Sequence, residues 1–172
     1  MGLKLNKKLL DIFKTTKTTS DEYSYTCSYV NEINSKHIIT AYYTSDKALN
    51  SEYKTPNFDS ADVIGTKLTL SNGKIKIGAG VSKVKVSFTV FYNNIGDTAY
   101  AWAQLTKNNT NVVGVITASP KAFMTGTCSE RIISVNENDL LSIKYNNPDY
   151  STGNLQVRGG GDNTYITVEV VE

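Results

Sequence analysis

Residues 37–172 predict an all-β domain, an antiparallel sandwich or barrel. Apolar and polar residues alternate there with a period of two, which is the period of a strand with one buried face. Clusters of Asn, Asp, Ser and Gly separate the alternating runs, as tight turns require. Ten runs have this pattern: 37–44, 66–70, 73–77, 83–92, 98–107, 111–117, 130–135, 140–146, 154–159 and 163–171.

Two of these runs differ in how they distribute their apolar residues. In run 83–92 one face is apolar and the other is mostly polar until Phe91. In run 98–107, Tyr100 and Trp102 share one face while Ala and Leu residues make the other face apolar as well. Both faces of that run are therefore expected to be covered, by a ligand, a loop or another subunit. The alternative for Trp102 is a place in the core of the monomer.

The run 163–171 follows three glycines and an Asp-Asn turn pair, and it is strand-like almost to residue 172. Chain ends usually fray unless something holds them. An apolar terminal run of this kind is therefore expected to pair inside a sheet.

The first 36 residues have a different pattern and are expected to form a separate attachment segment or linker. Leu5, Leu9, Ile12 and Phe13 recur at helical spacing, which predicts a short helix. A second segment opens at 19–22 with capping-box spacing, but the Tyr and Thr residues that follow favour a strand. The segment is thus predicted to be helical or extended.

Composition argues against several function classes. Eighteen Lys and Arg against sixteen Asp and Glu give a net charge of +2 without a basic stripe, so nucleic-acid binding is not expected. No run approaches the ~20 apolar residues of a membrane span, and the N-terminus lacks the uninterrupted apolar stretch of a signal peptide. The two cysteines, Cys27 and Cys128, are expected to be free thiols made in a reducing compartment.

The sequence offers no catalytic constellation, cofactor motif or metal site. His37 is the only histidine, so neither a zinc site nor an activated Cys128 is expected. Asp and Asn residues gather in loops, around Asp139, Asp149 and Asp162, but none of these loops has the calcium-binding pattern. Turn formation explains the same composition without an ion. We therefore expect a protein that is not an enzyme.

Loops rich in Tyr and Asn are the candidate ligand-binding features. Loops at one end of a sandwich commonly build recognition sites. Tyrosine rings there could stack on sugars while polar neighbours bind the hydroxyl groups. The candidate residues are Tyr42, Tyr43, Tyr53, Tyr145 and Tyr150.

Five segments, in order, resemble the jelly-roll superfamily of tumour necrosis factor and the globular heads of complement component one q, especially its variants in phage structural proteins. They are GKIKI (73–77), VKVSFTV (84–90), LTKNNT (105–110), ISVNENDLLSI (133–143) and TYITVEV (164–170). Asn109 and Asn138 stand where the family often has Gly. Asn is tolerable there because it enters left-handed backbone conformations more readily than most residues.

The resemblance implies a ten-stranded jelly-roll sandwich over residues 37–172 that assembles as a homotrimer with aromatic residues on its threefold axis. Carried over by position, Tyr165 is the first candidate for the axis, followed by Tyr100, Trp102 and Phe91. The resemblance also implies a phage virion as the location. There, residues 1–36 would bind other virion proteins and the head could contact a host surface glycan. The alternative is a monomeric carbohydrate-binding or accessory module of a bacterial surface protein.

Overall fold

The computed structural model describes residues 13–17, 23–27, 36–93, 100–118, 123–146 and 155–172. The chain divides into two compact units, Met1–Lys36 and His37–Glu172. In the first unit, β1 (Phe13–Lys17) pairs antiparallel with β2 (Tyr23–Cys27), with Phe13 opposite Cys27. The helix prediction is wrong at Phe13, where the chain is a strand, and of the two alternatives for the segment after residue 22 the extended one is present, because Tyr and Thr residues favour extended backbone. Residues 1–12 lie outside the described part.

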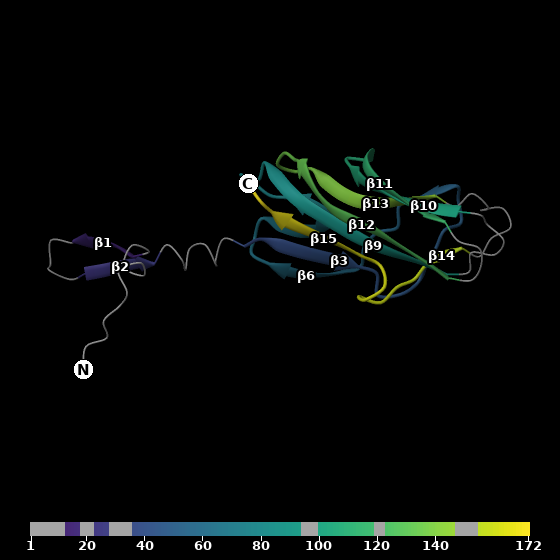
Figure 1. Ribbon diagram of the computed structural model, residues 1–172, viewed down its shortest axis with the longest axis horizontal. Helices are drawn as coiled ribbons and strands as arrows, with labels where there is room; N and C mark the ends of the chain where they lie inside the picture. The colour runs from purple at the N-terminus through teal and green to yellow at the C-terminus, as the bar shows by residue number, and fades with distance from the viewer. Residues whose placement is uncertain (1–12, 18–22, 28–35, 94–99, 119–122, 147–154) are drawn as a thin grey trace. The chain divides into compact units, whose positions relative to one another are not determined.

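The second unit is an all-β, antiparallel sandwich, as the sequence predicts (Figure 1). Its seven-stranded sheet has the order β4-β14-β9-β15-β3-β6, and β12 pairs with β9. The bounds are β3 Ile38–Tyr42, β4 Lys47–Ala48, β6 Ser60–Ile64, β9 Lys83–Asn93, β12 Phe123–Ser134, β14 Gln156–Val157 and β15 Tyr165–Val170. No helix occurs in the described ranges, so none of them contains a helix that could cross a membrane.

The six-stranded sheet has the order β11-β10-β13-β8-β7, and β5 pairs with β13. Its strands are β5 Tyr53–Lys54, β7 Leu68–Ser71, β8 Lys74–Ile77, β10 Tyr100–Lys107, β11 Thr110–Ala118 and β13 Leu140–Asn146. The alternating apolar residues of both sheets form one core cluster between them. From β9, for example, Val84, Val86, Phe88, Val90 and Tyr92 are all buried in this core, which confirms the predicted apolar face.

The last strand, β15, lies between β9 and β3, as Figure 1 shows in yellow. Its register places Ile166 opposite Phe88 on one side and opposite Ala41 on the other. Ile166 and Val168 are fully buried. The expected pairing of the terminal run inside a sheet is thus confirmed, and this strand is a central one.

Left-handed backbone occurs at the two asparagines that replace glycine in the family pattern. Asn109 has φ 67° and Asn138 has φ 69°. Both stand in turns between strands, where a positive φ reverses the chain. The expectation that Asn is tolerated at these positions is therefore confirmed.

Two of the three glycines before β15 form hydrogen bonds to the loop that follows β3. Gly159 N donates to Asp46 Oδ1 at 2.8 Å, and Gly160 N donates to Tyr43 O at 2.7 Å. Gly160 has φ 92°, a conformation that L residues rarely adopt. At Gly159 the reason for glycine is space, because a Cβ atom there would lie 2.2 Å from the backbone carbon of Ser45.

Gly159→Ala is expected to lower the free energy of unfolding by about 1–3 kcal/mol, because the backbone of Ser45 must move to admit the methyl group. Gly161→Ala is the matched control, since a Cβ there meets only the Tyr42 ring at 3.7 Å. The control is expected to change stability by no more than about 0.5 kcal/mol. Urea denaturation of the two variants and the wild type measures both effects, and equal midpoints for all three would contradict the expectation.

Candidate functional site

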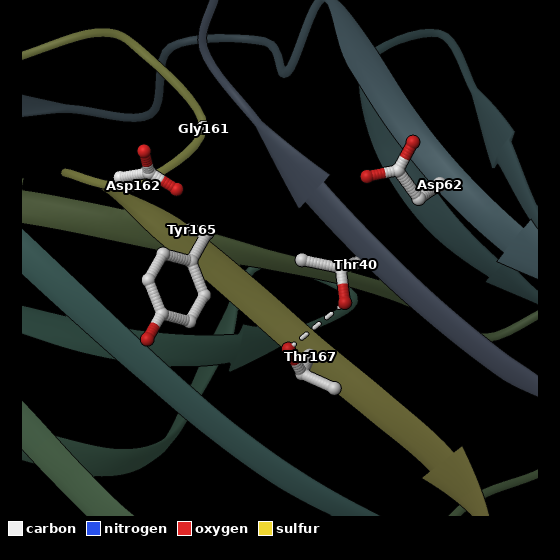
Figure 2. A pocket seen from close by; sticks show the side chains of 6 residues that line it. All are labelled: Thr40, Asp62, Gly161, Asp162, Tyr165 and Thr167. Atoms are coloured by element: carbon white, nitrogen blue, oxygen red, sulfur yellow. Dashed lines mark hydrogen bonds between the residues drawn. The ribbon is translucent and has the colours of Figure 1, made fainter.

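A polar hollow of about 410 Å³ opens on the outward face of the seven-stranded sheet. Its lining comes from β3, β6, β15 and the turn before β15: Thr40, Asp62, Gly161, Asp162, Tyr165 and Thr167. Figure 2 shows the Tyr165 ring on one side, Asp62 on the other, and the hydroxyl pair between them.

Strand register explains why these residues meet. Thr40 lies opposite Thr167 on one side and opposite Asp62 on the other. Because their strand neighbours Ile39, Ala41, Ile166 and Val168 point into the core, these three side chains point outward. The Thr40 and Thr167 hydroxyls are 3.1 Å apart and share a hydrogen bond.

The two carboxylates of the hollow belong to Asp62 and Asp162. Asp62 and Asp162 are both exposed, and neither makes an ion pair or hydrogen bond within the described residues. The carboxylates can accept hydrogen bonds from hydroxyl groups or pair with a cation, and the phenol of Tyr165 offers an aromatic face. Among the described residues there is no group of three or more His, Cys, Asp or Glu that could hold a metal ion.

Of the four residues predicted to line a threefold axis, the structure places only Tyr165 and Phe91 on one surface. Tyr165 and Phe91 lie on the outward face of the seven-stranded sheet, since Tyr165 pairs with Thr89 and Phe91 follows two residues later. Trp102 lies on β10 in the other sheet, and its neighbours Ala101 and Ala103 are buried in the core. Trp102 therefore points outward from the opposite side of the sandwich. The Tyr100 side chain lies outside the described part.

Trp102 thus cannot share one axis surface with Tyr165, which corrects that part of the prediction. The alternation of run 98–107 places Tyr100 and Trp102 on one face, but it does not reveal to which sheet the run belongs. The core alternative for Trp102 is also wrong, because its indole is only partly buried. A partner for Phe91 is present: the Arg158 guanidinium lies 5.4 Å from the centre of its ring.

Two of the predicted ligand-binding tyrosines belong to the core, which corrects the prediction for Tyr43 and Tyr145. Their hydroxyls are 3.3 Å apart, and the Tyr43 ring stacks on Phe58 at 4.8 Å. Both side chains are fully buried, so neither is available to a ligand, and this burial raises the pKa of each phenol. Tyr145 lies within β13, on the face of that strand that packs in the core, and Tyr43 follows the end of β3.

The other predicted tyrosines have different positions. Tyr42 lies on β3 opposite Tyr165, on the outward face. Tyr53 is 47% exposed and its ring lies 5.7 Å from that of Trp102. Tyr150 lies outside the described residues, as do the side chains of Cys27 and Cys128.

His37 and Asp139, which the sequence offered as possible catalytic or metal-binding residues, form hydrogen bonds within the chain. His37 Nδ1 accepts a hydrogen bond from Thr66 N at 3.1 Å. Asp139 Oδ2 accepts one from Asn136 N at 2.8 Å, and its Oδ1 accepts one from Asn108 Nδ2 at 2.6 Å. The Asp139 loop is therefore organised by turn hydrogen bonds within the chain. Sequence reasoning missed Thr40, Asp62 and Thr167, whose signal was only their polar positions in alternating strands.

Comparison with known proteins identifies the fold. No family model matches the chain, and no curated protein matches it. The crystal structure of murine APRIL at pH 5.0 matches with a TM-score of 0.61 and 8% identity, covering 79% of this chain and 99% of that one. The structure of Eiger TNF from S. frugiperda matches with a TM-score of 0.58 and 9% identity, covering 80% and 92%. At these identities the likeness establishes a tumour-necrosis-factor-like jelly roll.

Substitution of the buried tyrosines tests the hydrogen bonds assigned to the Tyr43 hydroxyl. Tyr43→Phe is expected to lower the free energy of unfolding by about 1 kcal/mol, because the Tyr43 hydroxyl donates to Pro56 O or bonds to the Tyr145 hydroxyl. Tyr92→Phe is the matched control, since the buried Tyr92 hydroxyl has no hydrogen-bond partner among the described residues. The control is expected to be neutral or slightly stabilising. Thermal and urea unfolding measure both, and a larger loss in Tyr92→Phe would contradict the assignment.

Proposed function

We propose that the protein is a non-enzymatic structural protein of a phage virion, with residues 37–172 forming a homotrimeric, receptor-binding head. In this proposal residues 1–36 attach the head to other virion proteins. A trimer presents three copies of any weak site, and such avidity can exceed single-site affinity by ~10²–10⁴. The proposal places self-association on the outward face of the seven-stranded sheet, with Tyr165 near the threefold axis.

The observation that carries self-association is the exposure of large apolar side chains on both flanks of this sheet. Ile132 on β12 is 65% exposed and Ile64 on β6 is 59% exposed, the two largest such values among the described apolar residues. A cyclic trimer joins two different surfaces of the same chain. The two flanks of the seven-stranded sheet supply such a pair, with Tyr165 between them.

The hollow beside β6 adds a requirement to this arrangement. It holds Asp62 and Asp162, which make no ion pair or hydrogen bond within the described residues. Burying these carboxylates in an interface requires a cation opposite them, because an unpaired buried charge is strongly unfavourable. In the proposed trimer a second copy of the chain supplies that cation.

Light scattering coupled to size-exclusion chromatography tests the trimer. The full chain is expected to have three times its 18.9 kDa mass at micromolar concentration. Tyr165→Lys and Ile132→Lys are each expected to reduce the mass toward that of a monomer, because they place a charge in the apolar contact.

Val112→Lys is the matched control for these variants. Val112 is 39% exposed on β11, in the other sheet, so its substitution is expected to leave the mass unchanged. A wild-type chain that runs as a stable monomer at micromolar concentration would remove the main support for the proposal.

The lining of the hollow favours a second candidate, a monomeric carbohydrate-binding module. An aromatic ring beside carboxylates and hydroxyls is a suitable lining for a sugar, and about 410 Å³ lies within the volume range of ligand pockets. This candidate gives the opposite result for Tyr165→Lys: the chain stays monomeric and loses sugar binding.

The virion location has its own test in the genome that encodes the chain. Flanking genes for capsid, tail or baseplate components are expected. Flanking genes for bacterial surface or secreted proteins, without virion genes, would instead favour the second candidate.

A further inference from the structure

A row of three side chains crosses the outward face of the six-stranded sheet. Trp102 on β10 lies opposite Asn146 on β13, and Asn146 lies opposite Tyr53 on β5. The neighbours Ala101, Ala103 and Tyr145 are buried in the core, so the row points away from it. This surface is on the other side of the sandwich from Tyr165 and the polar hollow.

The rings of Tyr53 and Trp102 approach each other across Asn146, the middle residue of the row. The rings of Tyr53 and Trp102 lie 5.7 Å apart at an angle of 52°. Lys144, two residues before Asn146 on the same face, places its Nζ 4.4 Å from the centre of the Tyr53 ring. The outward face of this sheet thus carries an aromatic pair, the exposed Tyr53 and the partly buried Trp102, with an ammonium group beside it.

Two buried amide oxygens on this face lack a hydrogen-bond donor among the described residues. Asn146 is 5% exposed, and its Oδ1 has no partner there, although its Nδ2 donates to Glu52 O at 3.3 Å. The other is the buried Oε1 of Gln104, the next outward residue on β10. A buried acceptor without a donor is unfavourable, so a ligand that brings a donor gains that energy on binding.

We infer that this surface, formed by Trp102, Tyr53, Asn146, Gln104 and Lys144, binds a pyranose ring of a saccharide. A pyranose has an apolar C–H face, which can stack on an aromatic ring, and hydroxyl groups that donate and accept hydrogen bonds. Its hydroxyls supply the donors that Asn146 Oδ1 and Gln104 Oε1 lack, and Lys144 donates to a sugar oxygen.

This inference rests on the proposed function, because self-association through the seven-stranded sheet leaves the opposite face of each subunit exposed. Three such sites on one trimer would give a multivalent contact with a glycan-covered surface. The inference also differs from the second candidate function, which places the sugar in the hollow beside Tyr165.

Trp102 makes the experiment direct, since it is the only tryptophan of the chain. The full chain is titrated with the methyl glycosides of glucose, galactose, mannose, N-acetylglucosamine and rhamnose while Trp102 fluorescence is recorded. At least one glycoside is expected to give a saturable change in intensity or emission wavelength. Tyr53→Ala is expected to weaken that binding at least tenfold, and Tyr53→Phe, which keeps the ring, is expected to retain it.

Tyr165→Ala separates the two possible sugar sites, with unfolding midpoints checked for every variant. Retained binding in Tyr165→Ala with loss in Tyr53→Ala supports the inference, whereas the reverse pattern overturns it. The absence of a saturable response to every glycoside also overturns it.

Light scattering on the same samples keeps this result apart from the proposed function. A trimer without a sugar response refutes the site and leaves self-association intact. A monomer with a Tyr53-dependent response supports the site and refutes the trimer.

Discussion

The pairing of β9 with its neighbours is the constraint on which the seven-stranded sheet depends. This strand, Lys83–Asn93, pairs with β12 along one side and with β15 and β14 along the other. Its strict alternation fixes which residues of those neighbours face the core, because a shift of one residue would reverse every side chain. The pairing with β9 therefore determines which side chains of β12, β14 and β15 face the core, and it places Tyr165 and Thr167 on the outward face.

The two outer faces of the sandwich have different chemistry. The seven-stranded sheet carries exposed isoleucines on its flanks and a hollow whose two carboxylates have no partner within the described residues. The six-stranded sheet carries an aromatic pair with a lysine, and two amide oxygens that find no donor in the described part of the chain. A mixed apolar and charged surface suits a contact between protein subunits, whereas aromatic rings over amides suit a small polar ring. Self-association and ligand binding can thus occupy opposite sides of one subunit.

Sequence reasoning succeeded where periodicity is local and failed where a site depends on register between distant strands. The alternation of β9 and β15 predicted both strands and their buried faces, and the turn chemistry of Asn109 and Asn138 predicted left-handed backbone. It missed β5 and β6, because two residues give no period and Ser60–Ile64 has little alternation. The hollow was missed too, since it joins Thr40 to Thr167 across 127 residues of chain.

The central place of β15 determines when the sheet can close. Strands β9 and β3 pair with β15 but not with each other, so until Tyr165–Val170 emerges both expose unpaired backbone edges. During synthesis the ribosome must release nearly all of residues 37–172 before this gap is filled. Open edges of this kind are sites of intermolecular strand pairing. A nascent chain of this protein is therefore most prone to aggregate after β9 has emerged and before β15 has, and loss of β15 would leave it in that state permanently.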